Sequence, residues 1–227
     1  MIRTVAETGS TNDDLAVLAR EGAEEGIWLR AERQTAGKGR QGRSWESPPG
    51  GNLYASTLVR VRPTDPPAAT LALVAGVALH EAVARFAPGV RIKWPNDLVV
   101  DGAKLAGILL EREGEAVIIG IGVNLAAHPA FLERPATSLA ALGGPAPAAQ
   151  FLERLAGIFV REIERWRSEP LDVLCRRWLD AAHPVGTALV TPEGAGLFDG
   201  LDASGALRLR LEDGTTRLVH AGDVFLL

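Results

Sequence analysis

Apolar positions along residues 1–184 follow two different periods, and these predict both helices and strands. Between Ala68 and Ala87 the bulky apolar residues recur near helical spacing while charged residues interrupt the run, which predicts a core helix rather than a membrane span. Two further helices are predicted over residues 147–167 and 170–181, because a proline suited to the first helical turn opens each segment.

Shorter apolar runs bounded by turn-forming residues predict strands. The run over residues 115–125 is nearly continuously apolar and rich in β-branched residues, as in a fully buried strand. Asp101-Gly102 lies between two of the runs and predicts a tight hairpin. The predicted strands cover residues 27–31, 52–61, 90–94, 98–100, 107–111 and 115–125.

The pattern changes after residue 184, where short apolar runs alternate with turn-forming pairs such as Asp199-Gly200 and Asp213-Gly214. Turns at this density leave no room for a helix and predict four or five short strands in a small barrel or sandwich. We therefore expect an α+β fold, with a mixed sheet flanked by helices over residues 1–184. A β module over residues 185–227 follows, and it is small enough to need the first domain for support.

Composition places the chain among ordinary globular proteins. Its 227 residues carry a formal net charge of −4, so no overall positive field draws it onto nucleic acid or an anionic membrane, and any anion site must be local. The single cysteine, Cys175, excludes an intramolecular disulfide and a multi-cysteine zinc site, and it favours a reducing compartment. The first residues contain no apolar signal segment. We expect a cytoplasmic protein with no membrane attachment.

A glycine-rich loop that follows Gln34 carries three cations, Lys38, Arg40 and Arg43, within six residues. Its glycines match the dinucleotide pattern G-x-G-x-x-G, but the proline- and glycine-rich residues 46–51 cannot form the helix that this pattern requires. Glycines let backbone N–H groups approach an anion, and guanidinium groups hold phosphate oxygens in a two-point fork. The loop is therefore predicted to bind an anion, and a solvated charged surface is the structural alternative.

Trp45 directly follows these cations. Its indole can stack on a nucleobase, or it can pin the loop to the core. Because glycines and prolines dominate residues 37–51, we expect little secondary structure there and a loop that moves.

A second group of polar residues lies at the predicted hairpin. Lys93, Asn96 and Asp97 precede the hairpin and Lys104 follows it, so the four side chains are expected to converge on one cleft. If Lys104 points inward it needs an anionic partner, since a buried unpaired ammonium is very costly. The alternative is an exposed hairpin lysine and an ordinary turn aspartate.

Two further segments carry polar groups beside predicted elements. Ser10-Thr11-Asn12 precedes an apolar run, and a side-chain cap at the start of a helix explains it by itself. Gly120 and Gly122 lie in a buried strand that ends at Asn124, and glycines there permit close approach of a ligand or another backbone. The histidines are scattered without metal-ligand spacing, and we assign no metal site to side chains.

Taken together, these segments resemble the bacterial biotin protein ligases, also called biotin-[acetyl-CoA-carboxylase] ligases. The motifs occur in the family order from residue 8 to about residue 125: S-T-N, Q-x-x-G-[RK]-G-R-x-G-R-x-W, N-L-Y-x-S, K-W-P-N-D, K-L-x-G-I-L-x-E and G-I-G-x-N. The resemblance implies a class II synthetase-like catalytic domain with a small C-terminal SH3-like β-barrel. It also implies a two-step reaction. Biotin and MgATP form biotinyl-5'-AMP, and a lysine of a biotin carboxyl carrier protein then attacks the mixed anhydride.

The resemblance assigns roles to particular positions. The implied biotin site comprises Ser10, Thr11, Asn12, Gln34, Gly37, Lys38, Gly39, Arg40, Lys104, Gly107 and Gly122. The implied ATP site comprises Arg40, Arg43, Trp45, Asn96, Lys104 and Asn124. Substrates are biotin and ATP, with Mg²⁺ accompanying ATP. The chain departs from most members at Lys38, where they have arginine, and lysine keeps the charge but loses the fork geometry.

Three of these residues are expected to be catalytic. Arg40 and Lys104 would neutralise the carboxylate and the triphosphate, which repel each other. Asp97 is a candidate base for the incoming lysine.

Two other functions fit parts of the sequence. One is an octanoate or lipoate ligase on a related fold, although the polar Ser10, Thr11, Asn12 and Gln34 favour a ureido ring over a plain acyl chain. The other is a non-catalytic small-molecule or RNA-binding module, but aromatic residues make up only 5% of the chain. Some relatives carry an amino-terminal helix-turn-helix domain. This chain reaches Ser10 almost at once, so we expect no DNA binding. The family includes both monomers and homodimers.

Overall fold

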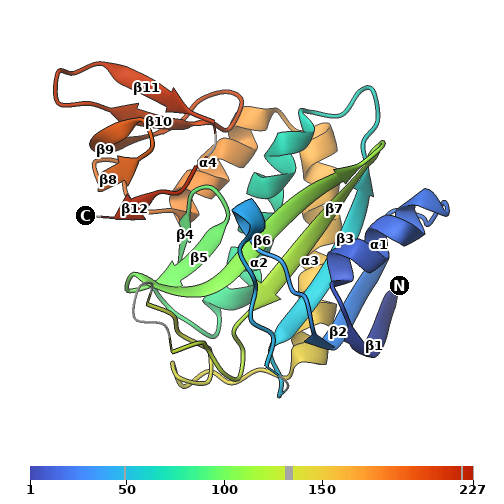
Figure 1. Ribbon diagram of the computed structural model, residues 1–227. Coiled ribbons are helices and arrows are strands. Elements are labelled where there is room, and N and C mark those ends of the chain that lie inside the picture. Colours follow the sequence, from blue (N-terminus) through green and yellow to red (C-terminus); the bar gives the residue numbers. More distant parts are fainter. Residues whose placement is uncertain (49, 131–134, 221, 227) are drawn as a thin grey trace.

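The computed structural model describes residues 1–48, 50–130, 135–220 and 222–226. Two sheets organise this part of the chain (Figure 1). A seven-stranded sheet comes first along the chain and has helices on both faces, and a five-stranded antiparallel sheet follows at the C-terminal end. The expected α+β class, a mixed sheet flanked by helices and followed by a small β module, is confirmed.

The large sheet has the strand order β1-β2-β3-β7-β6-β5-β4. Only β1 and β2 run parallel, and the other neighbouring pairs are antiparallel. Asp101 (φ 48°) and Gly102 (φ 79°) form the turn between β5 and β6, which confirms the predicted Asp-Gly hairpin. The strands are β1 (Ile2–Thr8), β2 (Trp28–Gln34), β3 (Leu53–Arg60), β4 (Arg91–Lys93), β5 (Asp97–Val100), β6 (Ala103–Glu113) and β7 (Ala116–Val123).

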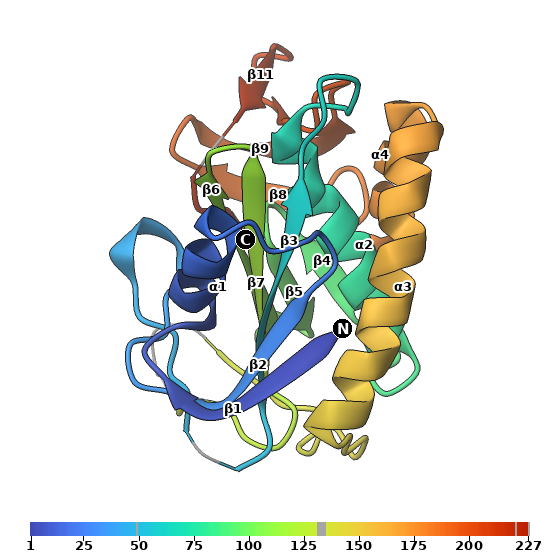
Figure 2. The same cartoon turned by 90° about the vertical axis from the view of Figure 1, so that its right-hand side faces the viewer.

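Different helices cover the two faces of this sheet (Figure 2). On one face lies α1 (Thr11–Arg20), and on the other lie α2 (Leu71–Ala84), α3 (Ala148–Ser168) and α4 (Leu171–Ala181). Alternate residues of β7 show the division, because Ile118 packs with the α1 side chains whereas Ile119 belongs to the larger core under α2 and α3. The functional site described below lies on the α1 face.

The C-terminal module packs onto the first domain. Its sheet has the order β11-β10-β9-β8-β12, formed by β8 (Ala188–Thr191), β9 (Gly194–Leu201), β10 (Leu207–Arg210), β11 (Thr216–Val219) and β12 (Phe225–Leu226). Phe198 of β9 contacts Trp178 of α4 edge to face, with ring centroids 6.5 Å apart, and Trp94 Nε1 donates to the Gly205 carbonyl at 3.3 Å. The module therefore shares the main hydrophobic core of the chain, as its small size requires.

Three elements differ from the sequence-based predictions. β1 is not predicted by the hydrophobic pattern, because it lies at the sheet edge with mostly exposed side chains. The helix predicted from Ala68 begins only at Leu71: residues Ala68–Thr70 form a 3-10 turn, which the Thr70 hydroxyl tightens by donating to the Pro67 carbonyl at 2.6 Å. The strand predicted over residues 107–111 spans Ala103–Glu113, since both of its edges are paired.

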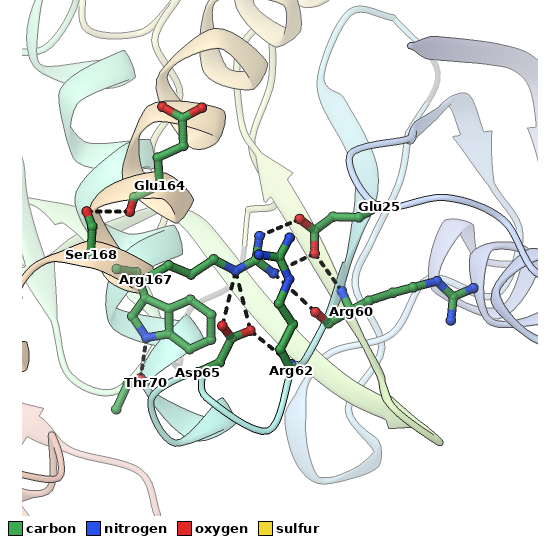
Figure 3. A network of polar contacts seen from close by, with 9 residues as sticks. Glu25, Arg60, Arg62, Asp65, Thr70, Glu164, Arg167 and Ser168 are labelled. Carbon is green, nitrogen blue, oxygen red and sulfur yellow. Dashed lines mark hydrogen bonds and ion pairs between the residues drawn. The ribbon is translucent and has the colours of Figure 1, made fainter.

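A polar network at one end of the large sheet joins α3 to β3 and to the loop before β2 (Figure 3). The Arg167 guanidinium donates to both carboxylate oxygens of Glu25, at 2.6 and 2.8 Å. It also donates to the Arg60 carbonyl at 3.1 Å and to Asp65 Oδ2 at 3.3 Å. Arg167 therefore ties three segments that are far apart in the sequence.

Candidate functional site

The α1 face of the large sheet forms the floor of a cavity of about 1010 Å³. Gly120 and Gly122 follow Ile118 on the same face of β7, and Gly107 of β6 pairs with Gly122. Larger side chains at these positions would fill the space above the sheet. The glycines therefore leave space for other groups to approach the sheet closely.

The first turn of α1 forms one end of the cavity. Ser10 is the N-cap residue by its backbone, and its carbonyl accepts from the Asp14 N–H at 3.1 Å, but its side chain makes no capping hydrogen bond. The expected side-chain cap is therefore wrong. Ser10 is only 3% exposed and lines the cavity.

Thr11 and Asn12, which follow Ser10, connect α1 to strands β2, β3 and β6 by hydrogen bonds. Gln34 Oε1 accepts from the Thr11 N–H at 2.8 Å and from the Thr11 hydroxyl at 3.0 Å. Ser56 Oγ lies 2.7 Å from Thr11 Oγ1 and donates to Asn12 Oδ1 at 2.6 Å. This end of the cavity is a pre-organised set of neutral polar groups.

The glycine-rich loop forms a wall of the same cavity, and it has more structure than the sequence predicts. Lys38 and Ser44 form a β-bridge around a 3-10 turn at Arg40–Gly42. Arg40 donates to Asn96 Oδ1 at 3.2 Å and to the Gly222 carbonyl at 3.3 Å. The loop is thus folded against both the hairpin region and the C-terminal module.

Lys38 pairs with Asp13 of α1. The hydrogen bond to Asp13 is the main reason why the pKa of the Lys38 ammonium is raised. Lys38 is therefore positively charged and held at the rim, where it lines the cavity.

Trp45 covers the glycine floor. An ideal Cβ on Gly122 would lie 2.4 Å from the indole of Trp45, and one on Gly107 would lie 3.0 Å from it. The indole nitrogen is buried and has no hydrogen-bond partner among the described residues. In this structure Trp45 packs the loop onto the sheet, which is the pinning role weighed from the sequence.

Gly37 contacts other residues of the glycine-rich loop and is not part of the cavity wall. Its carbonyl accepts from the Trp45 N–H at 2.8 Å, and a Cβ there would lie 2.5 Å from the Trp45 carbonyl oxygen. Gly37 is buried and does not line the cavity.

The hairpin supplies a paired lysine. Lys104 Nζ lies 2.7 Å from Asp97 Oδ1, an ion contact without hydrogen-bond alignment, and 5.4 Å from the centroid of the Trp45 ring. The register explains the pairing, because Lys104 on β6 lies opposite Val99 after a register shift, and Asp97 lies two residues before Val99 on the same face of β5. Lys104 thus has the anionic partner that an inward lysine requires.

Two asparagines tie the hairpin to its neighbours. Asn96 Nδ2 donates to the Ile108 carbonyl at 2.6 Å, so its oxygen is free to face Arg40. Asn124 is 4% exposed, and its Nδ2 donates to the Thr137 carbonyl at 3.1 Å. Both line the cavity.

The C-terminal module completes the rim, which the sequence does not predict. Asp223, Val224, Phe225 and Leu226 line the cavity. Asp223 accepts from two nitrogens of Arg43, at 3.0 and 2.8 Å. No local signal identifies these residues, because they reach the site only through the packing of the module on the first domain.

The predicted site residues lie together. All of them except Gly37 line one cavity: Ser10, Thr11, Asn12, Gln34, Lys38, Gly39, Arg40, Arg43, Trp45, Asn96, Asp97, Lys104, Gly107, Gly122 and Asn124.

Tyr54 is a cavity residue that the sequence analysis did not identify. It pairs with Gly122 in the sheet and lies on the cavity face. Burial raises the pKa of the Tyr54 hydroxyl, so that group stays neutral. Its place in N-L-Y-x-S, two residues before Ser56, is the signal that would have found it.

Positive side chains outnumber negative ones around the cavity. Lys38, Arg40, Arg43, Lys93 and Lys104 line it, against Glu46, Asp97 and Asp223, although the whole chain has a net charge of −4. One end is therefore suited to a neutral polar group and the other to anions.

Among the described residues no cluster of three or more His, Cys, Asp or Glu side chains is placed to hold a metal ion. In the same part of the chain, no helix has the length and apolar character needed to cross a membrane.

Comparison with known proteins places this chain in a family of ligases. The chain belongs to the biotin/lipoate A/B protein ligase family, whose family model matches residues 8–124, and residues 193–227 match the biotin protein ligase C-terminal domain.

Individual relatives that match nearly the whole chain are biotin ligases. The chain is 38% identical to the biotin--[acetyl-CoA-carboxylase] ligase of Paracoccus denitrificans, over 97% of this chain and 98% of the relative. It is also 38% identical to the ligase of that name from Mycobacterium tuberculosis, over 97% of this chain and 86% of the relative. The biotin protein ligase of Aquifex aeolicus, solved in complex with biotin and ATP, superposes with a TM-score of 0.87 at 25% identity, covering 100% of this chain and 98% of the other.

Proposed function

We propose that this protein is a biotin-[acetyl-CoA-carboxylase] ligase, which attaches biotin to a lysine of a biotin carboxyl carrier protein through biotinyl-5'-AMP. The observation that carries the proposal is one cavity with a neutral polar end at Thr11 and Gln34 and a cationic end at Arg40 and Lys104. Relatives with this name match nearly the whole chain at 38% identity.

In the first step a carboxylate oxygen of biotin attacks the α-phosphorus of ATP. The bond from that phosphorus to the bridging oxygen breaks, and pyrophosphate leaves with the bond electrons. Both reactants are anions, so cations that neutralise them lower the barrier. We assign this role to Arg40 and Lys104, with Arg43 on the phosphates. Mg²⁺ is proposed to enter as part of the MgATP substrate, because this ion is usually bound through substrate phosphates.

In the second step the amine of the carrier lysine attacks the carbonyl carbon of biotinyl-5'-AMP, and AMP leaves. The nucleophile must give up a proton, and we propose Asp97 as the acceptor. Its carboxylate faces the cavity beside Lys104. Trp45 is proposed to turn from the glycine floor toward adenine when ATP binds.

The test is biotin-dependent exchange of labelled pyrophosphate into ATP. We expect exchange with biotin and none with octanoate, because a plain acyl chain cannot hydrogen-bond to the polar groups around Thr11. Lys104→Ala should lower the exchange rate at least about 100-fold. Exchange that depends on octanoate instead of biotin would favour a lipoate or octanoate ligase, and binding without exchange would favour a non-catalytic module.

The proposal extends to partners and compartment. We expect the protein to transfer biotin to a purified carrier domain, and transfer to free lysine alone would argue against that partner.

We propose that the protein does not bind DNA, given its negative net charge, and a sequence-specific gel shift at physiological salt would contradict this. The single Cys175 supports a reducing, cytoplasmic setting.

A further inference from the structure

A carboxylate outside the cavity lies at the end of the hydrogen-bonded chain that organises the neutral polar end. Glu111 of β6 accepts from Asn12 Nδ2 at 2.6 Å. Asn12 Oδ1 accepts from Ser56 at 2.6 Å, and Ser56 Oγ lies 2.7 Å from Thr11 Oγ1. Asn12 and Thr11 line the cavity, whereas Glu111 does not.

The sheet register brings this chain together. Ser56 lies opposite Gly120, and Glu111 lies opposite Ile118, on adjoining strands. A Cβ on Gly120 would lie 2.4 Å from Asn12 Oδ1, so this glycine lets the amide of Asn12 reach down between the two partners. Ser56 is fully buried and does not line the cavity.

An ionised carboxylate can only accept hydrogen bonds, and this fixes the direction of the whole chain. Because Glu111 accepts, the amide of Asn12 must turn its nitrogen toward Glu111 and its oxygen toward Ser56. The single hydroxyl proton of Ser56 is then committed to Asn12, so Ser56 can only accept from Thr11.

The consequence reaches the cavity at Thr11. Thr11 Oγ1 carries a single proton, and both of its neighbours in this network, Ser56 Oγ and Gln34 Oε1 at 3.0 Å, accept, so that proton is used inside the network. Only lone pairs of Thr11 Oγ1 remain for a ligand. The site therefore offers a hydrogen-bond acceptor at Thr11 Oγ1. This acceptor suits the N–H donors of a ureido ring, whereas an alkyl chain has no donor for it.

We propose that Glu111 is a positioning residue for biotin recognition, because it sets the hydrogen-bond direction of Asn12, Ser56 and Thr11. The inference rests on the proposed function. It assigns the preference for a ureido N–H to a carboxylate that makes no contact with the ligand.

The other role open to Glu111 is electrostatic. The pKa of Lys38 is raised mainly by its hydrogen bond to Asp13, and Glu111 adds a smaller electrostatic contribution. The two roles separate under substitution, because glutamine keeps an acceptor oxygen for Asn12 but removes the charge that acts on Lys38.

The experiment measures biotin binding to the full chain without ATP, by calorimetry, for Glu111→Gln, Glu111→Leu and a control. Glu113→Leu is the control, because Glu113 lies two residues farther along β6 and pairs with Arg20 at 2.7 Å. We expect Glu111→Leu to weaken biotin binding about ten-fold or more, since a buried donor loses its acceptor. Glu111→Gln should stay within about three-fold of the parent chain, because its amide oxygen replaces the lost acceptor. The control should match the parent.

Steady-state exchange assays then separate positioning from general damage. Glu111→Leu should raise the KM for biotin while the KM for ATP stays unchanged. Equal biotin affinity in Glu111→Leu and the parent would overturn the inference. Equal losses in Glu111→Gln and Glu111→Leu would assign the effect to charge and would also overturn it. Failure of the parent chain to bind biotin would instead refute the proposed function.

Discussion

Arg43 of the glycine-rich loop and Asp223 of the C-terminal module form a two-point ion pair, with N–O distances of 3.0 and 2.8 Å. The pair joins residues that lie 180 positions apart in the sequence, and both residues line the cavity. A planar guanidinium and a carboxylate match each other in this geometry, which gives the contact direction as well as charge.

Limited trypsin digestion tests whether this pair restrains the loop. Lys38, Arg40 and Arg43 offer cleavage sites in it, and we expect cutting in the free protein and protection with biotin plus ATP. Asp223→Ala should be cut several-fold faster than the parent without ligands, because one anchor of the loop is lost. Equal cleavage of the parent with and without ligands would refute a loop that orders on binding.

Asp97→Asn separates the two steps of the reaction. Adenylation should stay within about ten-fold of the parent, since Lys104 keeps its charge and a polar neighbour. Transfer from preformed biotinyl-5'-AMP to the carrier domain should fall about 100-fold or more, if the carboxylate accepts the proton. Single-turnover transfer is the measurement, and Asp101→Asn at the exposed turn of the same hairpin is the control. Normal transfer by Asp97→Asn would remove Asp97 from this role.

Much of the site was predictable because its residues lie in short motifs attached to strands and turns. Asp101-Gly102 predicts the hairpin, and the hairpin brings Asp97 and Lys104 to the same cavity. The position of the β7 glycines was predictable for a similar reason, since alternate residues of a strand share a face and Gly120 and Gly122 are two residues apart.

What the sequence did not predict depends on tertiary packing. Ser10 has the composition of a helix cap, yet its side chain makes no capping bond and it lines the cavity instead. Asp223 carries no local signal, because its contact with Arg43 exists only once the C-terminal module docks. β1 is an exposed edge strand whose pairing with β2, rather than any hydrophobic alternation, defines it.

Gly122→Ala tests the glycine floor. The new methyl would meet the Trp45 indole at 2.4 Å, so either the ring or the strand must move. We expect biotin-dependent exchange to fall at least about ten-fold, because the methyl also enters the cavity floor. Gly157→Ala is the control, since Gly157 lies in α3 and, beyond its chain neighbours and the backbone of its own helix, no described residue comes within 4 Å of an ideal Cβ there, and it should leave exchange unchanged. Full activity of Gly122→Ala would show that the floor tolerates a side chain.

The network in Figure 3 predicts how stability depends on pH. Burial by itself raises the pKa of the Glu25 carboxyl, but hydrogen bonds from Arg167 and from the Arg60 N–H, with the nearby positive charges, outweigh it. The folded-state pKa of Glu25 therefore lies below its ordinary value of 4.5. A depressed carboxyl pKa stabilises the folded state above about pH 4.5 and loses that contribution as the pH falls through the folded value.

Glu25→Gln should therefore lower the free energy of unfolding by about 2 kcal/mol at pH 7, because it removes the closer of the two carboxylates that pair with the half-buried Arg167. Below pH 4 the difference from the parent should shrink, since the parent carboxyl is then becoming protonated. Urea unfolding at pH 7 and at pH 3.5 measures both values. Asp172→Asn removes an exposed pair with Arg176 and should cost at most about 0.5 kcal/mol at either pH. A Glu25→Gln loss that is the same size at both pH values would show that the network stabilises by packing rather than by its charge.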